Sequence, residues 1–377
     1  MTADDENYGG AIPHLLSGVP VRSVDDIVDL AGDYGVPALD AVMIAANFSG
    51  ARTELQHPRA RFQIWPDGPI TWPELFQLIL PLDNPESPFL LTDVELSFDD
   101  QVVARVQNVE NDDVVIAYPR KGGRAMTVNT YARSQCTGCI FCPNVIEDAA
   151  DDKLLTVDAL VEFLDLARQD YGWNDLSHLD RLTVSSGCFL NEPAAIDHLI
   201  LLRKAAASLG FGGVLHILSS VIRTKDGLTQ LAAEAGPFYL SLTLECFERR
   251  DLLLKDSKAS LTFDVAKQLM ADCRDVEVDV DFTYVVGLDG LDTAVTGTRT
   301  LLDNCTVFPK LQVYQAHNAF MRHSSHPDAR HLSYFFAYRQ AIDDIAGEIS
   351  LRPESWENYR PLWYTRFGDE PLRCLRI

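Results

Sequence analysis

Hydrophobic residues follow two alternating periods along the chain from about residue 125 onward. Short segments with an apolar residue at every second position, typical of β-strands, precede longer segments with the 3.6-residue period of an amphipathic helix. The predicted strands are "AMTVNTY", "LDRLTVSS", "GVLHILSS", "FYLSLTLE", "VEVDVDFTYVV" and "KLQVYQA". The predicted helices are "TVDALVEFLDLARQDYG", "PAAIDHLILLRKAAASLG", "DGLTQLAAEAG", "TFDVAKQLMADC", "DTAVTGTRTLLDN" and "HLSYFFAYRQAIDDIAGEI". Six such units in series predict an α/β fold whose parallel strands form a partial (β/α)6 TIM-like barrel.

The first 123 residues have a different pattern and predict a smaller α+β domain. Helical periods occur in "SVDDIVDLAGDYG", "PALDAVMIAANF" and "PELFQLILP", and an antiparallel meander is predicted over "VELSF", "VVARVQNV" and "VVIAY". The segment "RKGGR" is the best linker candidate. We therefore predict an accessory domain over 1–123, a barrel domain over 124–350 and a C-terminal tail over 351–377.

Three of the predicted strands carry polar residues on one alternating face. These residues are Ser241, Thr243 and Glu245 on the fourth strand, Asp279, Asp281 and Thr283 on the fifth, and Gln312 and Tyr314 on the sixth. One face of each strand in a barrel points into the lumen, so these positions predict a wet or ligand-filled interior. A polar sheet edge would give the same pattern.

Composition and charge narrow the class of protein. The 377 residues are 47% hydrophobic, which is enough for a sizeable core, and 32 basic against 55 acidic residues give a net charge of −23. A basic run is lacking, which argues against a nucleic-acid partner, and the excess of carboxylates favours a cationic substrate or partner. No segment approaches the ~20 apolar residues of a membrane span, and the acidic start "MTADDENYGG" lacks a signal-peptide pattern, so we expect a cytoplasmic protein without a membrane partner.

Cysteines are concentrated in the loop predicted after the first strand. Three of eight lie in "CTGCIFC", at Cys136, Cys139 and Cys142. Thiols at this spacing can converge on one soft metal ion or iron–sulfur cluster, although a fourth ligand is missing. The other cysteines, Cys188, Cys246, Cys273, Cys305 and Cys374, are scattered, and most are expected to be small buried side chains.

Together these features resemble the radical S-adenosylmethionine (radical SAM) superfamily. Its members carry Cys-x3-Cys-x2-Cys after the first strand with an aromatic residue before the last cysteine, where this chain has Phe141. The resemblance implies a [4Fe–4S] cluster held by Cys136, Cys139 and Cys142, with the open iron chelated by the methionyl group of SAM. It also implies a reductase, flavodoxin or ferredoxin as electron donor, and hydrogen abstraction from a substrate in the barrel.

The resemblance also assigns residues to SAM binding. "SSGCFLNEP" loosely matches the family's Gly-Gly-Glu-Pro motif after the second strand, through Gly187 and Glu192. After the fourth strand, Glu245 takes the place of a ribose ligand, and Arg249 or Arg250 that of a carboxylate ligand. "VVGL", with Val286 and Gly287, matches the segment that lies near adenine.

The first spacing departs from the family, since two residues separate Cys136 from Cys139 where three are usual. Cys-x2-Cys-x2-Cys-Pro also resembles ferredoxin-type ligation, so an electron-transfer or scaffold protein is the alternative, as is a structural zinc site. Neither alternative predicts six strand–helix units.

The sequence gives less information about the reaction than about the cofactors. Cysteine runs for auxiliary clusters and a cobalamin-binding signature are lacking, which leaves rearrangement, epimerisation, elimination or dehydrogenation. Cys374 could donate hydrogen to a substrate radical, although an incidental tail cysteine is the simpler interpretation. Four histidines after the sixth strand, at 317, 323, 326 and 331, could line the barrel mouth or lie in a solvated loop.

The expected substrate bears an amine and is either a small molecule or a peptide. Asp279, Asp281 and Glu245 would pair with an ammonium group, with Tyr314 beside them, unless an internal cation neutralises the carboxylates. A peptide would need a further docking surface, which residues 1–123 could provide.

Overall fold

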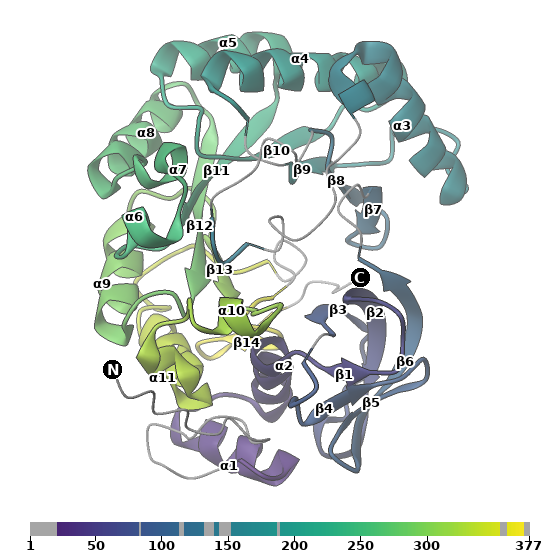
Figure 1. Ribbon diagram of the computed structural model, residues 1–377. Helices are drawn as coiled ribbons and strands as arrows, with labels where there is room; N and C mark the ends of the chain where they lie inside the picture. The colour runs from purple at the N-terminus through teal and green to yellow at the C-terminus, as the bar shows by residue number, and fades with distance from the viewer. Residues whose placement is uncertain are drawn as a thin grey trace, which may run out of the picture.

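The computed structural model describes residues 21–82, 84–112, 117–131, 139–142, 152–186, 189–354 and 360–372. These residues form two large sheets with their helices (Figure 1). Within these ranges, none of the helices combines the length and apolar character that crossing a membrane would require.

The second sheet along the chain contains the six predicted parallel strands. Its seven strands run in the order β13-β12-β11-β10-β9-β8-β7. Their bounds are β7 (Ala117–Arg120), β8 (Ala125–Val128), β9 (Arg181–Val184), β10 (Val214–Ser219), β11 (Phe238–Glu245), β12 (Asp279–Val286) and β13 (Lys310–Val313). Strands β8 to β13 pair in parallel and in chain order, whereas β7 is antiparallel to β8. The sheet is curled (Figure 1), and its hydrogen-bonded order ends at β13 and β7, so the described strands do not close into a ring.

The long helices cover the outer side of this curled sheet (Figure 1). They are α3 (Val157–Asp170), α4 (Glu192–Ser208), α5 (Lys225–Ala235), α8 (Phe263–Asp275) and α9 (Leu291–Leu302). Four of them begin at a capping side chain, for example Thr156, whose hydroxyl accepts a hydrogen bond from the Ala159 amide. Leu240, Leu242 and Leu244 of β11 are buried on the helix-covered face, which leaves the polar positions of the strand on the concave face.

Short helices that the sequence pattern did not predict follow the strands at their carboxyl ends. They are α6 (Arg250–Leu253), α7 (Asp256–Ala259), α10 (Ala319–Arg322), η4 (Asp152–Leu155) and η5 (Pro327–Arg330). Each is about one turn long, which is too short for an apolar period to be recognised.

The first sheet is mixed, and its strand order is β1-β4-β5-β6-β2-β3. It comprises β1 (Arg52–Thr53), β2 (Arg59–Pro66), β3 (Phe76–Pro81), β4 (Phe89–Leu91), β5 (Glu95–Phe98) and β6 (Gln101–Asn111), with η1 (Gly68–Ile70) between β2 and β3. Helices α1 (Val24–Asp33) and α2 (Ala38–Ser49) precede it, as predicted.

Two predictions for this region are wrong. "PELFQLILP" was expected to be helical, but Phe76–Pro81 is strand β3, because pairing with β2 outweighs the local preference of a short apolar run. The last predicted strand of the meander, "VVIAY", instead contributes its end to β7, which joins the second sheet. The change of sheet therefore falls between β6 and β7, ahead of the linker expected at 120–124.

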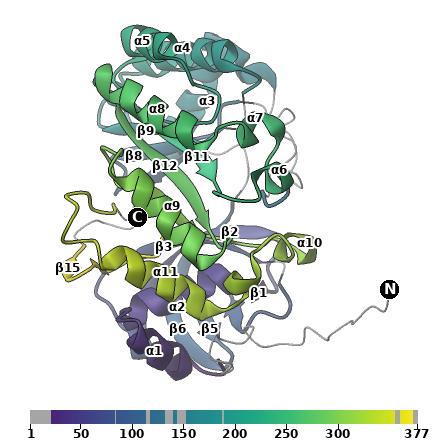
Figure 2. The same ribbon diagram turned by 90° about the vertical axis from the view of Figure 1, so that its left-hand side faces the viewer.

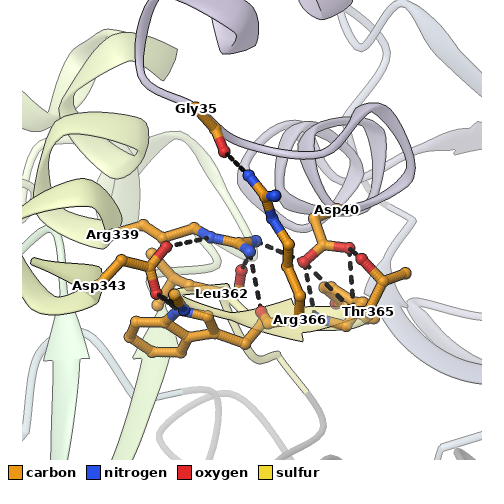
Figure 3. Close-up of polar contacts among 10 residues, drawn as sticks. Gly35, Asp40, Arg339, Asp343, Leu362, Thr365 and Arg366 are labelled. Atoms are coloured by element: carbon orange, nitrogen blue, oxygen red, sulfur yellow. Dashed lines mark hydrogen bonds and ion pairs between the residues drawn. The ribbon is translucent and has the colours of Figure 1, made fainter. Parts of the chain in front are cut away.

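The first sheet and its helices are anchored to the rest of the chain through α2. Asp40 in α2 is fully buried and forms an ion pair with Arg339 of α11 (Leu332–Asp343). The same carboxylate accepts hydrogen bonds from the Tyr364 amide at 2.9 Å and from the Thr365 hydroxyl at 2.7 Å (Figure 3). Figure 2 shows α11 between α9 and α2, so these contacts join the two parts of the molecule.

The C-terminal segment is part of the core, in contrast to the tail expected over 351–377. Leu362, Trp363 and Tyr364 are buried. The carbonyl of Arg360 accepts a hydrogen bond from Val313, and Pro361 bridges to Gln312, so this segment runs beside β13. It ends in the small hairpin of β14 (Arg366–Phe367) and β15 (Glu370–Pro371).

Candidate functional site

Two of the three clustered cysteines lie at the carboxyl-terminal edge of the parallel sheet. The amide of Cys142 donates a hydrogen bond to the carbonyl of Cys139 at 3.1 Å, so one turn carries both thiols. The amide of Ile140 donates to the carbonyl of Leu253 at 3.0 Å, which fixes this turn against α6. Cys136 lies outside the described residues. We call residues 139–142 the cysteine turn.

Apolar side chains from the loops after β11, β12 and β13 surround the cysteine turn. Cys139 and Phe141 belong to a buried cluster with Cys246, Leu253, Leu254, Ala259, Val285, Leu288, Tyr314 and Met321. Burial raises the pKa of the Cys246 thiol far above its usual range, so this cysteine stays protonated and serves as an apolar side chain. The cluster shields the cysteine turn from water on that side.

Tyr314 forms the other wall of this cluster. Its ring meets that of Phe141 edge to face, with the centroids 6.4 Å apart, and its hydroxyl donates to the carbonyl of Met321 at 2.7 Å. Burial raises the pKa of the Tyr314 hydroxyl, with a smaller contribution from Cys142. Gly287 is required beneath it, because its φ is +120° and a Cβ there would lie 3.0 Å from Tyr314 Cβ.

Glu245 and Lys258 form an ion pair at the mouth of the curled sheet. Glu245 ends β11 in a bulge with φ at 69°, and its Oε1 lies 2.6 Å from Lys258 Nζ. Both side chains are largely buried, with 15% and 11% exposed. The sequence analysis named Arg249 and Arg250 as the basic residues after this strand and missed Lys258, because α7 has no recognisable period and only the fold brings Lys258 back to Glu245.

The two candidate arginines mainly organise the loops. Arg250 donates to the carbonyls of Leu244 and Lys258, each at 2.8 Å, and also bonds the carbonyls of Cys246 and Ala259. Its guanidinium group is therefore occupied by backbone, which corrects the expectation that it binds the SAM carboxylate. Arg249 makes longer contacts, of 3.4 and 3.3 Å, to the carbonyls of Leu288 and Ser324.

Glu192 connects two loops at the same edge. It begins α4, and its Oε1 accepts hydrogen bonds from the amides of Arg223 at 2.7 Å and Thr224 at 2.9 Å. The carboxylate thus ties the loop after β9 to the loop after β10. Gly187 and Cys188, from the same predicted motif, lie outside the described residues, as does Cys374.

The concave face of the sheet carries a buried polar network, as the alternation predicted. His216 forms hydrogen bonds with Thr183 at 3.1 Å and Ser241 at 2.8 Å, and it stacks on Tyr239 with ring centroids 4.0 Å apart. Asp281 forms an ion pair with Lys310, whose ammonium also lies 4.8 Å from the Tyr239 ring centroid. Five successive strands, β9 to β13, contribute to this network.

Two sequence-based assignments to the lumen change in the structure. Asp279 is exposed at the amino end of β12, the end opposite the cysteine turn. Asp281 lies inside, where its Oδ2 forms an ion pair with Lys310, and its Oδ1 has no hydrogen-bond partner among the described residues. The side chain of Val286, which the resemblance assigned to the adenine segment, packs in the main core, and that of Val285 lies in the cluster around the cysteine turn, because successive residues of a strand face opposite sides.

Among the described residues, the thiols of the cysteine turn are donor atoms of the kind that bind an iron–sulfur cluster. Cys139 and Cys142 are two soft donors on one turn, and the fold places them beside an apolar wall, as thiolate ligation of such a cluster requires. A set of three or more His, Cys, Asp or Glu residues suited to a metal ion is not found within the described ranges. Cys136 would be the third thiol.

Comparison with known proteins gives little further information. Neither a protein-family model nor a curated protein matches the chain. Among solved structures, the radical S-adenosylmethionine methyltransferase TsrM from Kitasatospora setae, with cobalamin and a [4Fe–4S] cluster bound, matches at 13% identity and a TM-score of 0.35. The alignment covers 50% of this chain and 36% of that chain, and so slight a likeness carries no functional argument.

Proposed function

We propose that this protein is a radical SAM enzyme with a partial (β/α)6 barrel. The observation that carries the proposal is a Cys-x2-Cys-x2-Cys segment that follows the first of six parallel strands, at the end of the sheet where such folds perform their chemistry. Cys136, Cys139 and Cys142 would hold a [4Fe–4S] cluster. When bound, such a cluster would supply the one electron needed for reductive cleavage of SAM to methionine and a 5′-deoxyadenosyl radical, the species that would abstract hydrogen from substrate.

The chain's own residues would position SAM beside the cysteine turn. Glu245, held at the mouth of the sheet by its ion pair with Lys258, would accept hydrogen bonds from the ribose hydroxyls of SAM, in the place that the resemblance gives it. Tyr314, Phe141 and Leu288 line the apolar side, which excludes water from the reacting groups. Gly287 allows Tyr314 to take this position.

Iron binding tests the cysteine assignment. After anaerobic reconstitution, we expect about four irons per chain, and we expect Cys136→Ala, Cys139→Ala or Cys142→Ala to lose them. Cys305→Ala is the matched control, since Cys305 lies away from the cysteine turn and its sulfur bonds the carbonyl of Leu301. Formation of 5′-deoxyadenosine from SAM then distinguishes a radical SAM enzyme from an electron-transfer protein. Stable zinc binding without this product would refute the proposal.

A further inference from the structure

Tyr314, which walls the cysteine turn, lies just beyond the end of β13. Its amide donates to the carbonyl of Val286 at 2.9 Å, which continues the pairing with β12 by one residue. Its hydroxyl donates to the carbonyl of Met321 at 2.7 Å and so closes the loop that leads into α10. The ring meets that of Phe141 edge to face. The place of this ring therefore depends on how the chain is held directly after β13.

The next residue, Gln315, is anchored to the N-terminal region. Its side-chain nitrogen donates to Asn47 Oδ1 of α2 and to the carbonyl of Ile79 in β3, both at 2.8 Å. Gln315 is 1% exposed, and Asn47 is fully buried. Both hydrogens of the Gln315 amide are thus used, and buried polar groups with such partners hold their side chains in one position. Gln315 therefore ties the chain after β13 to α2 and to the first sheet.

Asn47 is fixed by further hydrogen bonds of its own. Its Nδ2 donates to the carbonyl of Met43 at 2.8 Å, one turn earlier in α2, and to the Tyr364 hydroxyl of the C-terminal segment at 2.7 Å. The amide of Tyr364 in turn donates to the buried carboxylate of Asp40. The acceptor that Gln315 uses is therefore part of the rigid group that joins α2 to the C-terminal segment.

We propose that Gln315 is a positioning residue for the proposed reaction and that it acts by fixing Tyr314 against the cysteine turn. The two residues are consecutive, and their side chains bond different parts of the molecule: Tyr314 bonds α10, whereas Gln315 bonds α2 and β3. Without the Gln315 anchor, the backbone after β13 gains freedom, and the Tyr314 ring turns away from Phe141. The link to a reaction rests on the proposed function, whereas the shielding of the cysteine turn by Tyr314 does not.

This inference gives the N-terminal region a function in the site. Helix α2 and strand β3 hold, through Gln315, the side chain that keeps water from one side of the cysteine turn. Exclusion of water strengthens the electrostatic interactions inside a site and prevents side reactions of reactive intermediates. The N-terminal region contributes to the site in this way without a residue of its own in contact with substrate.

Release of iron to a chelator tests the inference. After anaerobic reconstitution, the rate at which excess EDTA removes iron reports access to the cysteines, whether or not the protein cleaves SAM. We expect Gln315→Met, which keeps the length of the side chain without its amide, to release iron about fivefold faster than wild type. Asn47→Ala removes the acceptor from the other side and should have the same effect, so that either variant decides if the other fails to fold.

The matched control is Thr298→Val. It also removes a buried hydrogen bond, the one of 2.7 Å between Thr298 of α9 and Tyr338 of α11, but this bond has no connection to Tyr314. We expect its rate of iron release to stay within about twofold of wild type.

A double-mutant cycle with Tyr314→Ala distinguishes positioning from a general loss of stability. Tyr314→Ala should itself release iron faster, and Gln315→Met in that background should add less than about twofold, because the side chain that it positions is gone. Equal acceleration by Gln315→Met with and without Tyr314 would overturn the inference. So would wild-type rates in both Gln315→Met and Asn47→Ala.

Formation of 5′-deoxyadenosine from SAM is measured on the same preparations. Iron release that follows the expected pattern without cleavage of SAM refutes only the proposed function. Cleavage of SAM by a protein whose iron release is indifferent to Gln315 refutes only the positioning role.

Discussion

At the scale of single residues, the role of a buried ionic group depends on the partner that balances its charge. Asp281 has no exposed surface, and Lys310 is 2% exposed, so each charge is tolerated only because the other is present. From the sequence, Asp281 suggested a binding site for an amine. In the structure it is half of an internal ion pair with Lys310.

Replacement of Asp281 by asparagine should therefore lower stability. Asp281→Asn leaves the buried ammonium of Lys310 without its counter-charge, and we expect the free energy of unfolding to fall by about 3–5 kcal/mol in urea titrations. The double variant Asp281→Leu/Lys310→Met removes both charges and should recover most of the loss. Unchanged stability of Asp281→Asn together with weaker substrate binding would restore the original interpretation of Asp281 as a ligand.

At the scale of elements, polar side chains connect neighbouring loops at the carboxyl edge of the parallel sheet. Asp289, after β12, accepts hydrogen bonds from the amides of Phe247 at 2.7 Å and Glu248 at 3.0 Å, in the loop after β11. Arg223, after β10, bonds the Ser260 hydroxyl at 3.0 Å. His198 in α4 bonds Thr130, which follows β8 and precedes the cysteines. These bonds set the positions of loops that share no backbone pairing.

His198 should make stability depend on pH. Burial lowers the pKa of His198 from 6.5 to about 4, because the neutral ring is favoured in the folded chain. Between those values the unfolded chain binds a proton that the folded chain does not, so stability falls as pH drops through this window. Between pH 7 and pH 5, we expect wild type to lose about 2 kcal/mol more than His198→Gln in urea unfolding.

The matched control is His323→Gln, because His323 is exposed. That variant should keep the pH dependence of wild type. If the wild type and His198→Gln lose the same stability between pH 7 and pH 5, His198 does not titrate as its burial requires.

At the scale of the whole molecule, the first sheet is locked to the second by the group around Asp40 (Figure 3). Arg339 also bonds the carbonyls of Leu362 and Arg366, so one buried arginine links α2, α11 and the C-terminal segment. The N-terminal region is thus joined to the rest of the molecule by a buried ion pair and its hydrogen bonds.

Loss of the Asp40 charge should destabilise the molecule. For Asp40→Asn, we expect the free energy of unfolding to fall by about 1–3 kcal/mol, because Arg339 loses its fully buried counter-charge and keeps only the longer contact of 3.3 Å to Asp343. Asp33→Asn, on the exposed face of α1, is the control and should change it by less than about 0.5 kcal/mol. Wild-type stability for Asp40→Asn would show that the two sheets are held together by apolar packing alone.

The hydrophobic periodicity of the sequence predicted many helices and strands of this molecule, because it depends on interactions between residues that are close in the chain. The six parallel strands, their long helices, α1, α2 and the hairpin of β5 and β6 all follow from apolar spacing, which reports the face that each element buries. The polar concave face, with Ser241 and Thr283, was predicted for the same reason. The cluster site indicated by the cysteine spacing stays a prediction that iron binding will test. Strand β3 was missed because the seven residues between Pro73 and Pro81, five of them apolar, fit either structure, and pairing with β2 decided between them.

Tertiary structure alone decided which charges meet. Asp281 and Lys310 are 29 residues apart in sequence, and Asp40 and Arg339 are 299 apart, so no local pattern could pair them. Lys258 returns to Glu245 through two one-turn helices that have no sequence period. Burial is a property of the individual element, whereas the pairing of buried charges depends on the whole fold, which is why the sequence predicted the polar lumen but not the ion pair inside it.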